Sequence, residues 1–353
     1  MPFAAPLSLL RRLVPALFGL ALSGCSTLDY YAHLGQGQWQ LLQARQPVAR
    51  LLADPATEPP LARRLALAQQ ARDFASARLQ LPDNRSYRLY ADLGRPFVVW
   101  NLFATPEFSL EPELHCFPIA GCVAYRGYYQ LGRARGAAAL LRQQGLDTHI
   151  GGVEAYSTLG WFDDPLLNTM LRWDDQRLVA VIFHELAHQQ YYLAGDTAFN
   201  ESFATFVERE GLRQWHASRG EAHADDGERQ RQQFVELVLA SRERLQRLYA
   251  SELDAVAMRA AKQAEFERLR RDYRALRQRE WAGNGRFDAW IEAPLNNAKL
   301  LPFGLYDQWV PAFAALFAQH AGDWADFYRA VAALGRLPPA ERRAALDRLQ
   351  AGG

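Results

Sequence analysis

The chain has 353 residues, of which 49% are hydrophobic and 22% are charged. This composition is typical of a globular protein of one or two domains with a sizeable core. The 40 basic and 39 acidic residues leave a net charge of +1. The charge balance therefore predicts no nucleic-acid partner and no polybasic membrane-binding surface.

The N-terminal segment has the pattern of a signal peptide. Arg11 and Arg12 precede an apolar stretch at residues 13–22, which is shorter than the roughly 20 residues that a membrane-spanning helix needs. Residues 1–24 are therefore predicted to be a processing segment that is removed.

The end of this segment, Leu-Ser-Gly-Cys at residues 22–25, resembles the lipobox of bacterial lipoproteins. That resemblance implies cleavage before Cys25 and a lipid on its side chain. The alternative is an ordinary secretory signal that ends near a cysteine. Ser26 follows the cysteine, which implies an outer-membrane anchor with the mature chain facing the periplasm.

Two further cysteines, Cys116 and Cys122, lie close together in the sequence. In an oxidising compartment this spacing favours a disulfide that closes a short loop. A zinc site that uses both cysteines and His115 is the weaker interpretation, because no further ligands follow at a typical spacing.

The hydrophobic pattern predicts a mainly α-helical chain with a small β-sheet, an α+β fold. Helical spacing over residues 39–79 is interrupted by prolines between residues 54 and 60, and from Asp174 onward the pattern is helical to the end. The intervening and later predicted elements are short strands within 87–129, a helix over 133–144, an extended segment over 147–158, and a long helical hairpin over 228–281.

We expect residues 25–353 to form a single region without a clear internal domain boundary. Within it, residues 25–130 supply N-terminal helices and strands, and residues 131–220 supply the core of the predicted site. Residues 221–353 form a C-terminal helical part.

The chemistry is concentrated in the apolar segment 179–190, which contains the pattern His-Glu-x-x-His. On a helix His184 and His188 lie on one face, so both imidazoles can reach one zinc ion, and Glu185 can reach a water beside it. The apolar flanks predict that these three side chains are buried, where a metal would satisfy them. The alternative is two solvated or capped histidines on an ordinary helix.

A third zinc ligand is predicted on the next helix. Gly195 and Asp196 can turn the chain, and Glu201 then lies near the start of a helix that runs back past the first. Glu208 lies on the same face two turns later and is expected to support the site without binding the metal. The alternative for Glu201 is a first-turn acid favoured by the helix dipole.

These residues resemble the zinc site of the gluzincin metallopeptidases, particularly the aminopeptidase N type with its Asn-Glu-x-Phe-Ala helix. The whole chain resembles a family of bacterial lipoproteins described as predicted zinc aminopeptidases. Segments 123–129, 155–165 and 296–298, together with the zinc helix, carry that second resemblance. It implies a zincin-like core and one zinc ion per chain. The connection between His188 and Glu201 is shorter than in the aminopeptidase N type.

The resemblance implies hydrolysis of a peptide bond by a water that the metal activates. Glu185 would take a proton from that water and deliver it to the leaving amine. Tyr306 is the first candidate for an oxyanion donor and Tyr156 the second. Either tyrosine could instead be a core or rim aromatic whose hydroxyl is satisfied.

Two further candidates concern substrate binding. Residues 151–155 are similar to the Gly-x-Met-Glu-Asn strand of aminopeptidase N-type enzymes, which implies that Glu154 holds the free amine of the substrate. The alternative is a glutamate at a strand edge. Asn296 and Asn297 could hydrogen-bond the substrate main chain, or could form a turn before a helix.

The sequence therefore favours a zinc aminopeptidase that acts on periplasmic peptides. A zinc endopeptidase is one alternative. The other is a lipid-anchored structural or assembly factor that retains a metal site without catalysis. A purely structural zinc normally has four protein ligands and needs no Glu185 beside an open position, which favours the enzyme.

Overall fold

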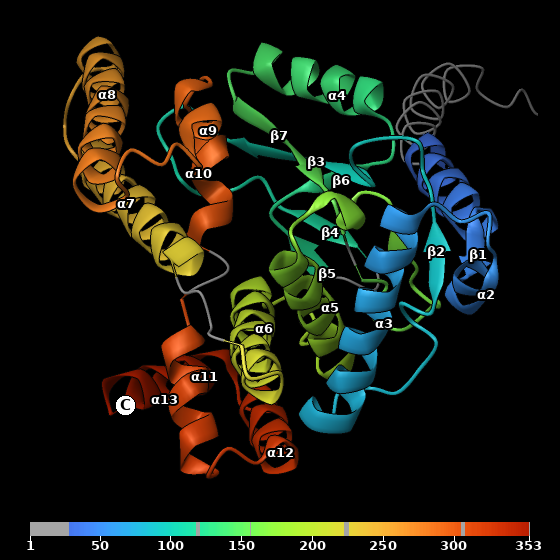
Figure 1. The fold of residues 1–353 in the computed structure, drawn as a ribbon. Coiled ribbons are helices and arrows are strands. Elements are labelled where there is room, and N and C mark those ends of the chain that lie inside the picture. The colour runs from blue at the N-terminus through green and yellow to red at the C-terminus, as the bar shows by residue number, and fades with distance from the viewer. Residues whose placement is uncertain (1–27, 118–120, 156, 222–225, 305–307, 353) are drawn as a thin grey trace, which may run out of the picture.

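The computed structural model describes most of the chain after the predicted signal peptide, namely residues 28–117, 121–155, 157–221, 226–304 and 308–352. Helices predominate over small sheets in this part (Figure 1), which confirms the predicted α+β character. Residues 1–24 and Cys25 lie outside the described residues, so cleavage and lipidation stay predictions. None of the described helices is long and apolar enough to cross a membrane.

The helices follow the proline and capping signals of the sequence. Prolines occupy the first turns of three of them, where the missing N–H has no intrahelical partner. After a helix over residues 28–43, the helices are α2 (Val48–Ala53), α3 (Pro59–Leu79), α4 (Leu131–Gln143), α5 (Asp175–Gln190), α6 (Thr197–Ser218), α7 (Asp226–Tyr249), α8 (Ala255–Glu280), α9 (Asp288–Glu292), α10 (Asn297–Leu300), α11 (Val310–Gln319), α12 (Trp324–Gly335) and α13 (Pro339–Ala351). Two 3₁₀ turns, η1 (Met170–Arg172) and η2 (Leu301–Gly304), complete the helical elements.

The strands are short, as the alternating aromatic and β-branched runs predict. They are β1 (Arg45–Pro47), β2 (Leu89–Ala91), β3 (Val99–Thr105), β4 (His115–Phe117), β5 (Gly121–Val123), β6 (Arg126–Tyr128), β7 (Asp147–Val153) and β8 (Leu166–Leu167). The expectation of helix at residues 45–47 was wrong. That segment pairs with β2, a partner more than 40 residues away, and local periodicity does not reveal such a contact.

The sheet that shapes the site has the strand order β6-β3-β7, with both pairings antiparallel. Helix α4 lies along one face of this sheet (Figure 1), where Leu102 and Tyr128 pack against Ala134 and Ala138. Because side chains alternate along a strand, Val99 and Asn101 point to the opposite face. That face is directed toward α5 and α6.

Two hydrophobic clusters stabilise the helical parts. The larger joins α3, α5, α6, α11, α12 and α13 around a set of fully buried phenylalanines, among them Phe183, Phe203 and Phe327. The second lies within the α7–α8 hairpin and its neighbours α9 and α10, around Phe234 and Tyr273. The predicted helical hairpin is therefore confirmed, and it has a core of its own. The three-part division of residues 25–353 stays a prediction.

Cys116 and Cys122 form the predicted disulfide. They are register partners in the β4–β5 pair, so the bond joins two neighbouring strands. Because both sulfurs are bonded to each other, the zinc-site interpretation that used His115 has no support here.

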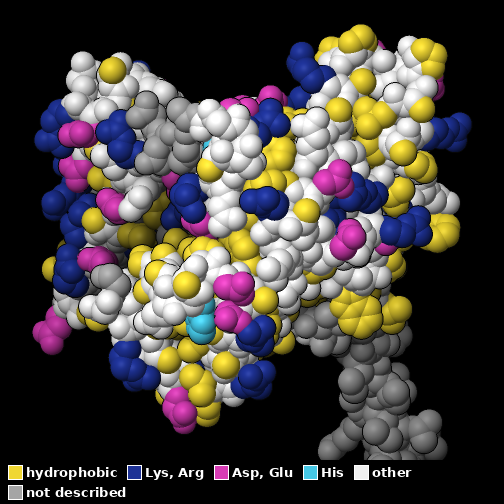
Figure 2. Space-filling model, turned by 60° about the horizontal axis from the view of Figure 1, so that its bottom comes forward, with side chains coloured by type: hydrophobic (Ala, Val, Ile, Leu, Met, Phe, Trp, Pro, Cys, Tyr) yellow, Lys and Arg dark blue, Asp and Glu magenta, His cyan; other side chains and the backbone are white. Residues whose placement is uncertain are grey.

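Charged side chains of both signs are interspersed over the surface. Figure 2 shows arginine and lysine alternating with aspartate and glutamate on one face, with hydrophobic side chains between them. On that face the described charges are therefore mixed and not divided between large patches of opposite sign.

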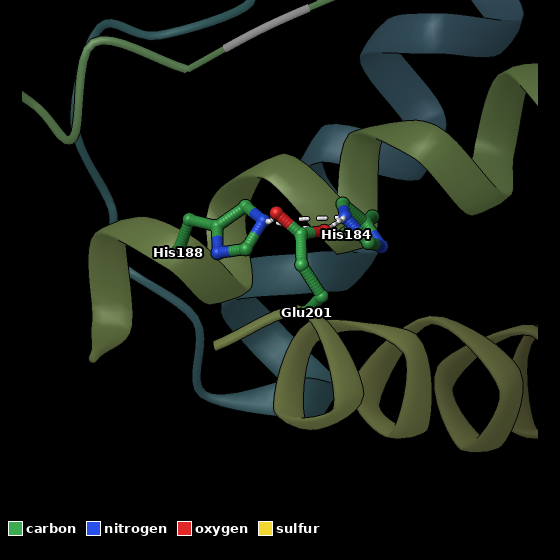
Figure 3. Close-up of side chains that lie close together, drawn as sticks. All are labelled: His184, His188 and Glu201. Atoms are coloured by element: carbon green, nitrogen blue, oxygen red, sulfur yellow. Dashed lines mark hydrogen bonds and ion pairs between the residues drawn. The ribbon is translucent and has the colours of Figure 1, made fainter. Parts of the chain in front are cut away.

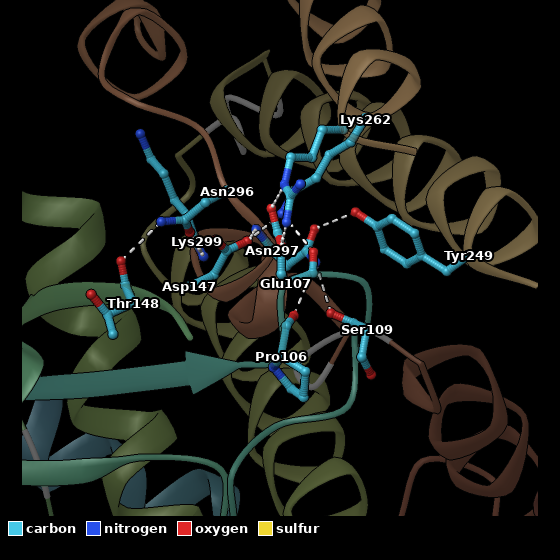
Figure 4. Close-up of polar contacts among 11 residues, drawn as sticks. Pro106, Glu107, Ser109, Asp147, Thr148, Tyr249, Lys262, Asn296, Asn297 and Lys299 are labelled. Carbon is cyan, nitrogen blue, oxygen red and sulfur yellow. Dashed lines mark hydrogen bonds and ion pairs between the residues drawn. The ribbon is translucent and has the colours of Figure 1, made fainter. Parts of the chain in front are cut away.

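Asn297 is fully buried at the start of α10, where it connects distant parts of the chain (Figure 4). Its Nδ2 donates to the carbonyls of Glu107 at 2.9 Å and Ser109 at 2.8 Å. Its Oδ1 accepts from the hydroxyl of Tyr249 at 2.7 Å. The expectation that Asn297 binds substrate is therefore wrong, because its amide is used inside the protein. The turn-forming alternative holds for Asn296, whose side chain caps α10.

Lys262 of α8 enters the same cluster. Its ammonium lies 2.6 Å from Asp147 of β7 and 2.7 Å from the carbonyl of Glu107. The ammonium is buried, and Asp147 also accepts from the main-chain N–H of Asn297. The cluster thus fixes the helical hairpin to the end of the sheet through charge-assisted hydrogen bonds.

Replacing Asn297 with alanine tests this structural role. The change leaves two carbonyls and a phenol without their partner in the interior, so we expect the free energy of unfolding to fall by about 2–4 kcal/mol. Chemical denaturation measures the loss. An unchanged unfolding midpoint would contradict the assignment.

His149 on β7 predicts a pH dependence of stability. Burial, with a smaller effect of the Lys299 charge, lowers the pKa of His149 to about 4. The unfolded chain binds a proton on this imidazole near pH ~6.5, whereas the folded chain does so only near its lower pKa. His149 therefore makes the folded state less stable as the pH falls from about 6.5 to about 4.

The test compares His149→Phe with the parent. Phenylalanine preserves the stacking on Phe103 but does not titrate. Urea unfolding at neutral pH and at about pH 5 should show a smaller acid-induced loss of stability in the variant than in the parent. Identical losses in both proteins would rule out His149 as the titrating group.

Candidate metal centre and active site

The helix that carries the His-Glu-x-x-His pattern is held in the interior. Asp174 begins α5 by accepting a hydrogen bond from the main-chain N–H of Arg177 at 2.7 Å. Nearly every residue of the following segment, 178–188, is buried. His184, Glu185 and His188 are only 9%, 8% and 8% exposed, as the apolar flanks predicted.

The turn from α5 to α6 is fixed by the asparagine that precedes Glu201. The side chain of Asn200 accepts from the main-chain N–H of Leu193 and donates to its carbonyl, both at 2.8 Å. Gly195 supplies a positive φ of 82°, and Asp196 caps α6 through the N–H of Phe199. This capped turn brings α6 back along α5 and places Glu201 opposite the two histidines.

Three side chains converge on one point between the helices (Figure 3). The Nε2 atoms of His184 and His188 lie 3.2 Å apart, and Glu201 Oε2 lies 3.4 Å and 3.7 Å from them. Donors around one tetrahedral zinc at its usual bond lengths are separated by roughly 3.3 Å. The group could therefore hold a metal ion with little rearrangement.

Glu208 orients the first imidazole. Its Oε2 lies 2.9 Å from His184 Nδ1, and because an ionised carboxylate only accepts, the hydrogen is on Nδ1 and Nε2 is the atom of this ring that would bind a metal. Glu208 thus has the predicted supporting position. His188 Nδ1 is buried and has no hydrogen-bond partner among the described residues, so the polar contacts of the second ring are those of its Nε2 with His184 and Glu201.

The electrostatics show mutual compensation of buried charges. Burial alone would lower the pKa of His184, but hydrogen bonds and charge from Glu201 and Glu208 raise it well above its ordinary value. Burial would likewise raise the pKa of Glu201, yet His188 and His184 lower it to about 2. Two carboxylates therefore stabilise positive charge between the helices, and a bound cation would supply that charge in place of a proton.

Glu185 lies beside this group, and no hydrogen bond from the described residues reaches its carboxylate. Burial, the largest influence, raises the pKa of Glu185, although the imidazoles of His184 and His188 oppose that shift. A buried carboxylate with a raised pKa is a stronger base than one in water.

The metal group opens into a cavity of about 460 Å³. The residues around it come from α5 and α6, from the sheet β6-β3-β7, from the β4–β5 pair, from the helix of residues 28–43 and from the segment after β7. His184, Glu185, His188 and Glu201 all contribute to its lining. The arrangement therefore combines three metal donors, a neighbouring base and space for a ligand.

Four described tyrosines that the sequence analysis did not select line this cavity, namely Tyr30, Tyr125, Tyr129 and Tyr192. The charge of Glu201 acts on two of them, Tyr125 and Tyr192. Burial raises the pKa of Tyr125, and the nearby charge of Glu201 adds to that shift. Tyr125 belongs to the 123–129 segment that carried the family resemblance, which was the available signal. Tyr156 and Tyr306, the tyrosines named from the sequence, lie outside the described residues.

Glu154 is not brought to the cavity. Its Oε2 accepts from Trp173 Nε1 at 2.8 Å and lies 3.0 Å from Arg177 Nη2. Val153 and Ala155 on either side line the cavity, so alternation along the extended chain directs Glu154 away from it. The predicted contact with a substrate amine is therefore wrong, and the strand-edge alternative holds.

The fold and the site together define an α+β protein in which the two histidines of a His-Glu-x-x-His pattern and Glu201 could hold a metal ion beside a cavity. The family model described as "Putative aminopeptidase" matches residues 29–346. The chain belongs to that family, which associates it with peptidases at a coarse level. No curated protein and no solved structure matches the chain.

Removing either carboxylate tests the metal assignment. We expect Glu201→Ala to lose stoichiometric zinc, because only two protein donors remain. Glu208→Ala should weaken zinc affinity about 10–100-fold, since His184 loses the group that orients it. Elemental analysis and competition with a chelator measure both effects. Glu210→Ala, a glutamate of the same helix that pairs with Arg213, is the matched control. Full zinc content in Glu201→Ala would exclude this carboxylate as a ligand.

Proposed function

We propose that this protein is a zinc-dependent peptidase, most simply an aminopeptidase. The observation that carries the proposal is the convergence of His184, His188 and Glu201 in a cavity whose wall also contains Glu185. Three protein donors leave one position of a tetrahedral zinc open, which is the arrangement of catalytic and not of structural zinc sites. The family description supports peptide hydrolysis at a coarse level.

A zinc ion bound there would supply Lewis acidity and lower the pKa of water toward neutrality. Glu185 would accept a proton from the attacking water on its carboxylate and then deliver that proton to the nitrogen of the leaving amine. Its raised pKa, caused mainly by burial, suits a group that must both take and release a proton near neutral pH.

A donor to the developing oxyanion is needed opposite the base. Tyr125 and Tyr192 are the described tyrosines beside Glu201 and Glu185, and burial raises the pKa of each, so both remain neutral donors at ordinary pH. Tyr125 and Tyr192 are therefore candidate oxyanion donors, in addition to Tyr306 and Tyr156, which the sequence suggested.

We further propose that the protein acts in the cell envelope. The lipobox at residues 22–25 would leave Cys25 lipidated and anchor the mature chain, with Ser26 directing it to the outer membrane and its site facing the periplasm. The disulfide between Cys116 and Cys122 suits an oxidising compartment. Peptides in the periplasm would then be the substrates.

The position of Glu154 favours one second candidate, a zinc endopeptidase. An aminopeptidase needs a group that recognises the free amine of its substrate, and Glu154 is occupied by Trp173 and Arg177. Comparing free peptides with their N-acetylated forms separates the two candidates. An aminopeptidase cleaves the free forms far faster, whereas an endopeptidase cleaves both.

The central test is Glu185→Gln in the full chain. Glutamine keeps the size of the side chain but cannot accept the proton, so kcat should fall by about 10²–10⁴-fold while zinc content is unchanged. Hydrolysis of a fluorogenic free-amine peptide library measures the effect. Glu236→Gln on the exposed side of α7 is the matched control. Equal activity of Glu185→Gln and the parent would reject catalysis at this site and favour the non-catalytic assembly factor.

A further inference from the structure

One amide side chain in the cavity wall is flanked by glycines on both sides. Asn101 on β3 is the register partner of Gly127 on β6 and of Gly151 on β7. Register partners point to the same face of a sheet, and glycines have no side chain to place there. Neither residue directly opposite Asn101 therefore has a side chain that covers it on the face directed at the metal group.

Most other polar groups of the cavity are already used within the protein. The hydroxyl of Tyr30 donates to the carbonyl of Gly127, and that of Tyr129 donates to Gln38. Ser157 contacts Asp164, while Asn200 is bonded twice to Leu193.

Asn101 differs from these groups. No hydrogen bond from the described residues reaches its side-chain amide, although it is only partly exposed and lines the cavity. An amide offers one acceptor and two donors, which is the complement of a peptide main chain with its N–H and C=O.

Much of the remaining wall is hydrophobic. Apart from the metal group and Glu185, the described lining contains no charged side chain. Its hydrophobic part comes from separate elements, namely Leu34, Val99, Phe117, Val123, Val153 and Leu159. Against this hydrophobic part of the wall a charged side chain would lose its hydration without gaining a partner, whereas a bulky apolar one would be stabilised by burial.

We propose that this cavity selects a bulky uncharged residue of the substrate, such as leucine or phenylalanine, next to the cleaved bond. Asn101 hydrogen-bonds the main chain of that residue, and the glycines on either side give the main chain room to approach. The volume of about 460 Å³ lies within the range of small-ligand pockets. This inference rests on the proposed peptidase function and names its substrate class.

The first experiment compares peptides that differ in one residue, using the zinc-loaded full chain. We expect kcat/KM for leucine and phenylalanine to exceed that for glycine, lysine and aspartate by at least about tenfold. Similar rates for leucine and lysine peptides, all abolished in Glu185→Gln, would overturn the inference and leave the peptidase function standing. No hydrolysis of any peptide would instead overturn the proposed function.

The second experiment removes the amide and narrows the space beside it. Asn101→Leu should raise KM for leucine peptides about tenfold without lowering zinc content, because the hydrogen bonds to the main chain are lost. Gly127→Val should shift preference toward smaller residues, since even a Cβ atom at this position would lie 3.4 Å from Asn101 Oδ1. Asn284→Leu, an exposed asparagine in the loop after α8, is the control.

A binding measurement keeps the inference testable apart from turnover. Calorimetry with leucinamide and lysinamide on zinc-loaded Glu185→Gln should show tighter binding of leucinamide. That preference should weaken when Asn101→Leu is added. Equal binding of the two amides would overturn the inference whatever the hydrolysis rates are.

Discussion

The structure depends on the cost of placing ionisable side chains in its interior. His184, Glu185, His188 and Glu201 lie between two packed helices, away from most solvent. Isolated charges in such a place are strongly unfavourable, so they must be paired with one another or with a cation. The close approach of three donor atoms, the supporting bond from Glu208 and the opposed pKa shifts of His184 and Glu201 are all responses to that single constraint.

Hydrogen bonds and hydrophobic packing hold the elements around these four side chains in place. The Asn200 amide fixes the turn that returns α6 along α5, while phenylalanines such as Phe183 and Phe203 fill the space behind the two helices. On the other side of the cavity, α4 covers the far face of the sheet (Figure 1). The buried pair of Lys262 and Asp147 then joins the end of that sheet to a helical hairpin with its own core.

The convergence of His184, His188 and Glu201 could be predicted from the sequence because the information for it is local. His184 and His188 are one helical turn apart, and the capped turn before Glu201 is short enough to be inferred from Gly195 and Asp196. The prediction that Glu154 binds the substrate amine was wrong because a strand exposes alternate residues to opposite faces. A motif of five residues does not fix which face meets the cavity. The prediction that Asn297 binds substrate was wrong because its hydrogen-bond partners, around residues 107–109 and at 249, are brought to it only by the tertiary fold. Strand β1 and the position of Tyr125 in the cavity also depend on tertiary contacts, so the sequence did not predict them.

The two parts of the site differ in how far along the chain they extend. Every residue that touches the metal position or supports it directly lies within the 25 residues from 184 to 208, one helix pair. The cavity walls are drawn from segments as far apart as residue 30 and residue 201. Under the proposed function, reaction chemistry and substrate preference are therefore encoded separately. Substitutions in the walls can change what the site accepts without disturbing the helix pair, so relatives with the same ligands can diverge in the molecules they recognise.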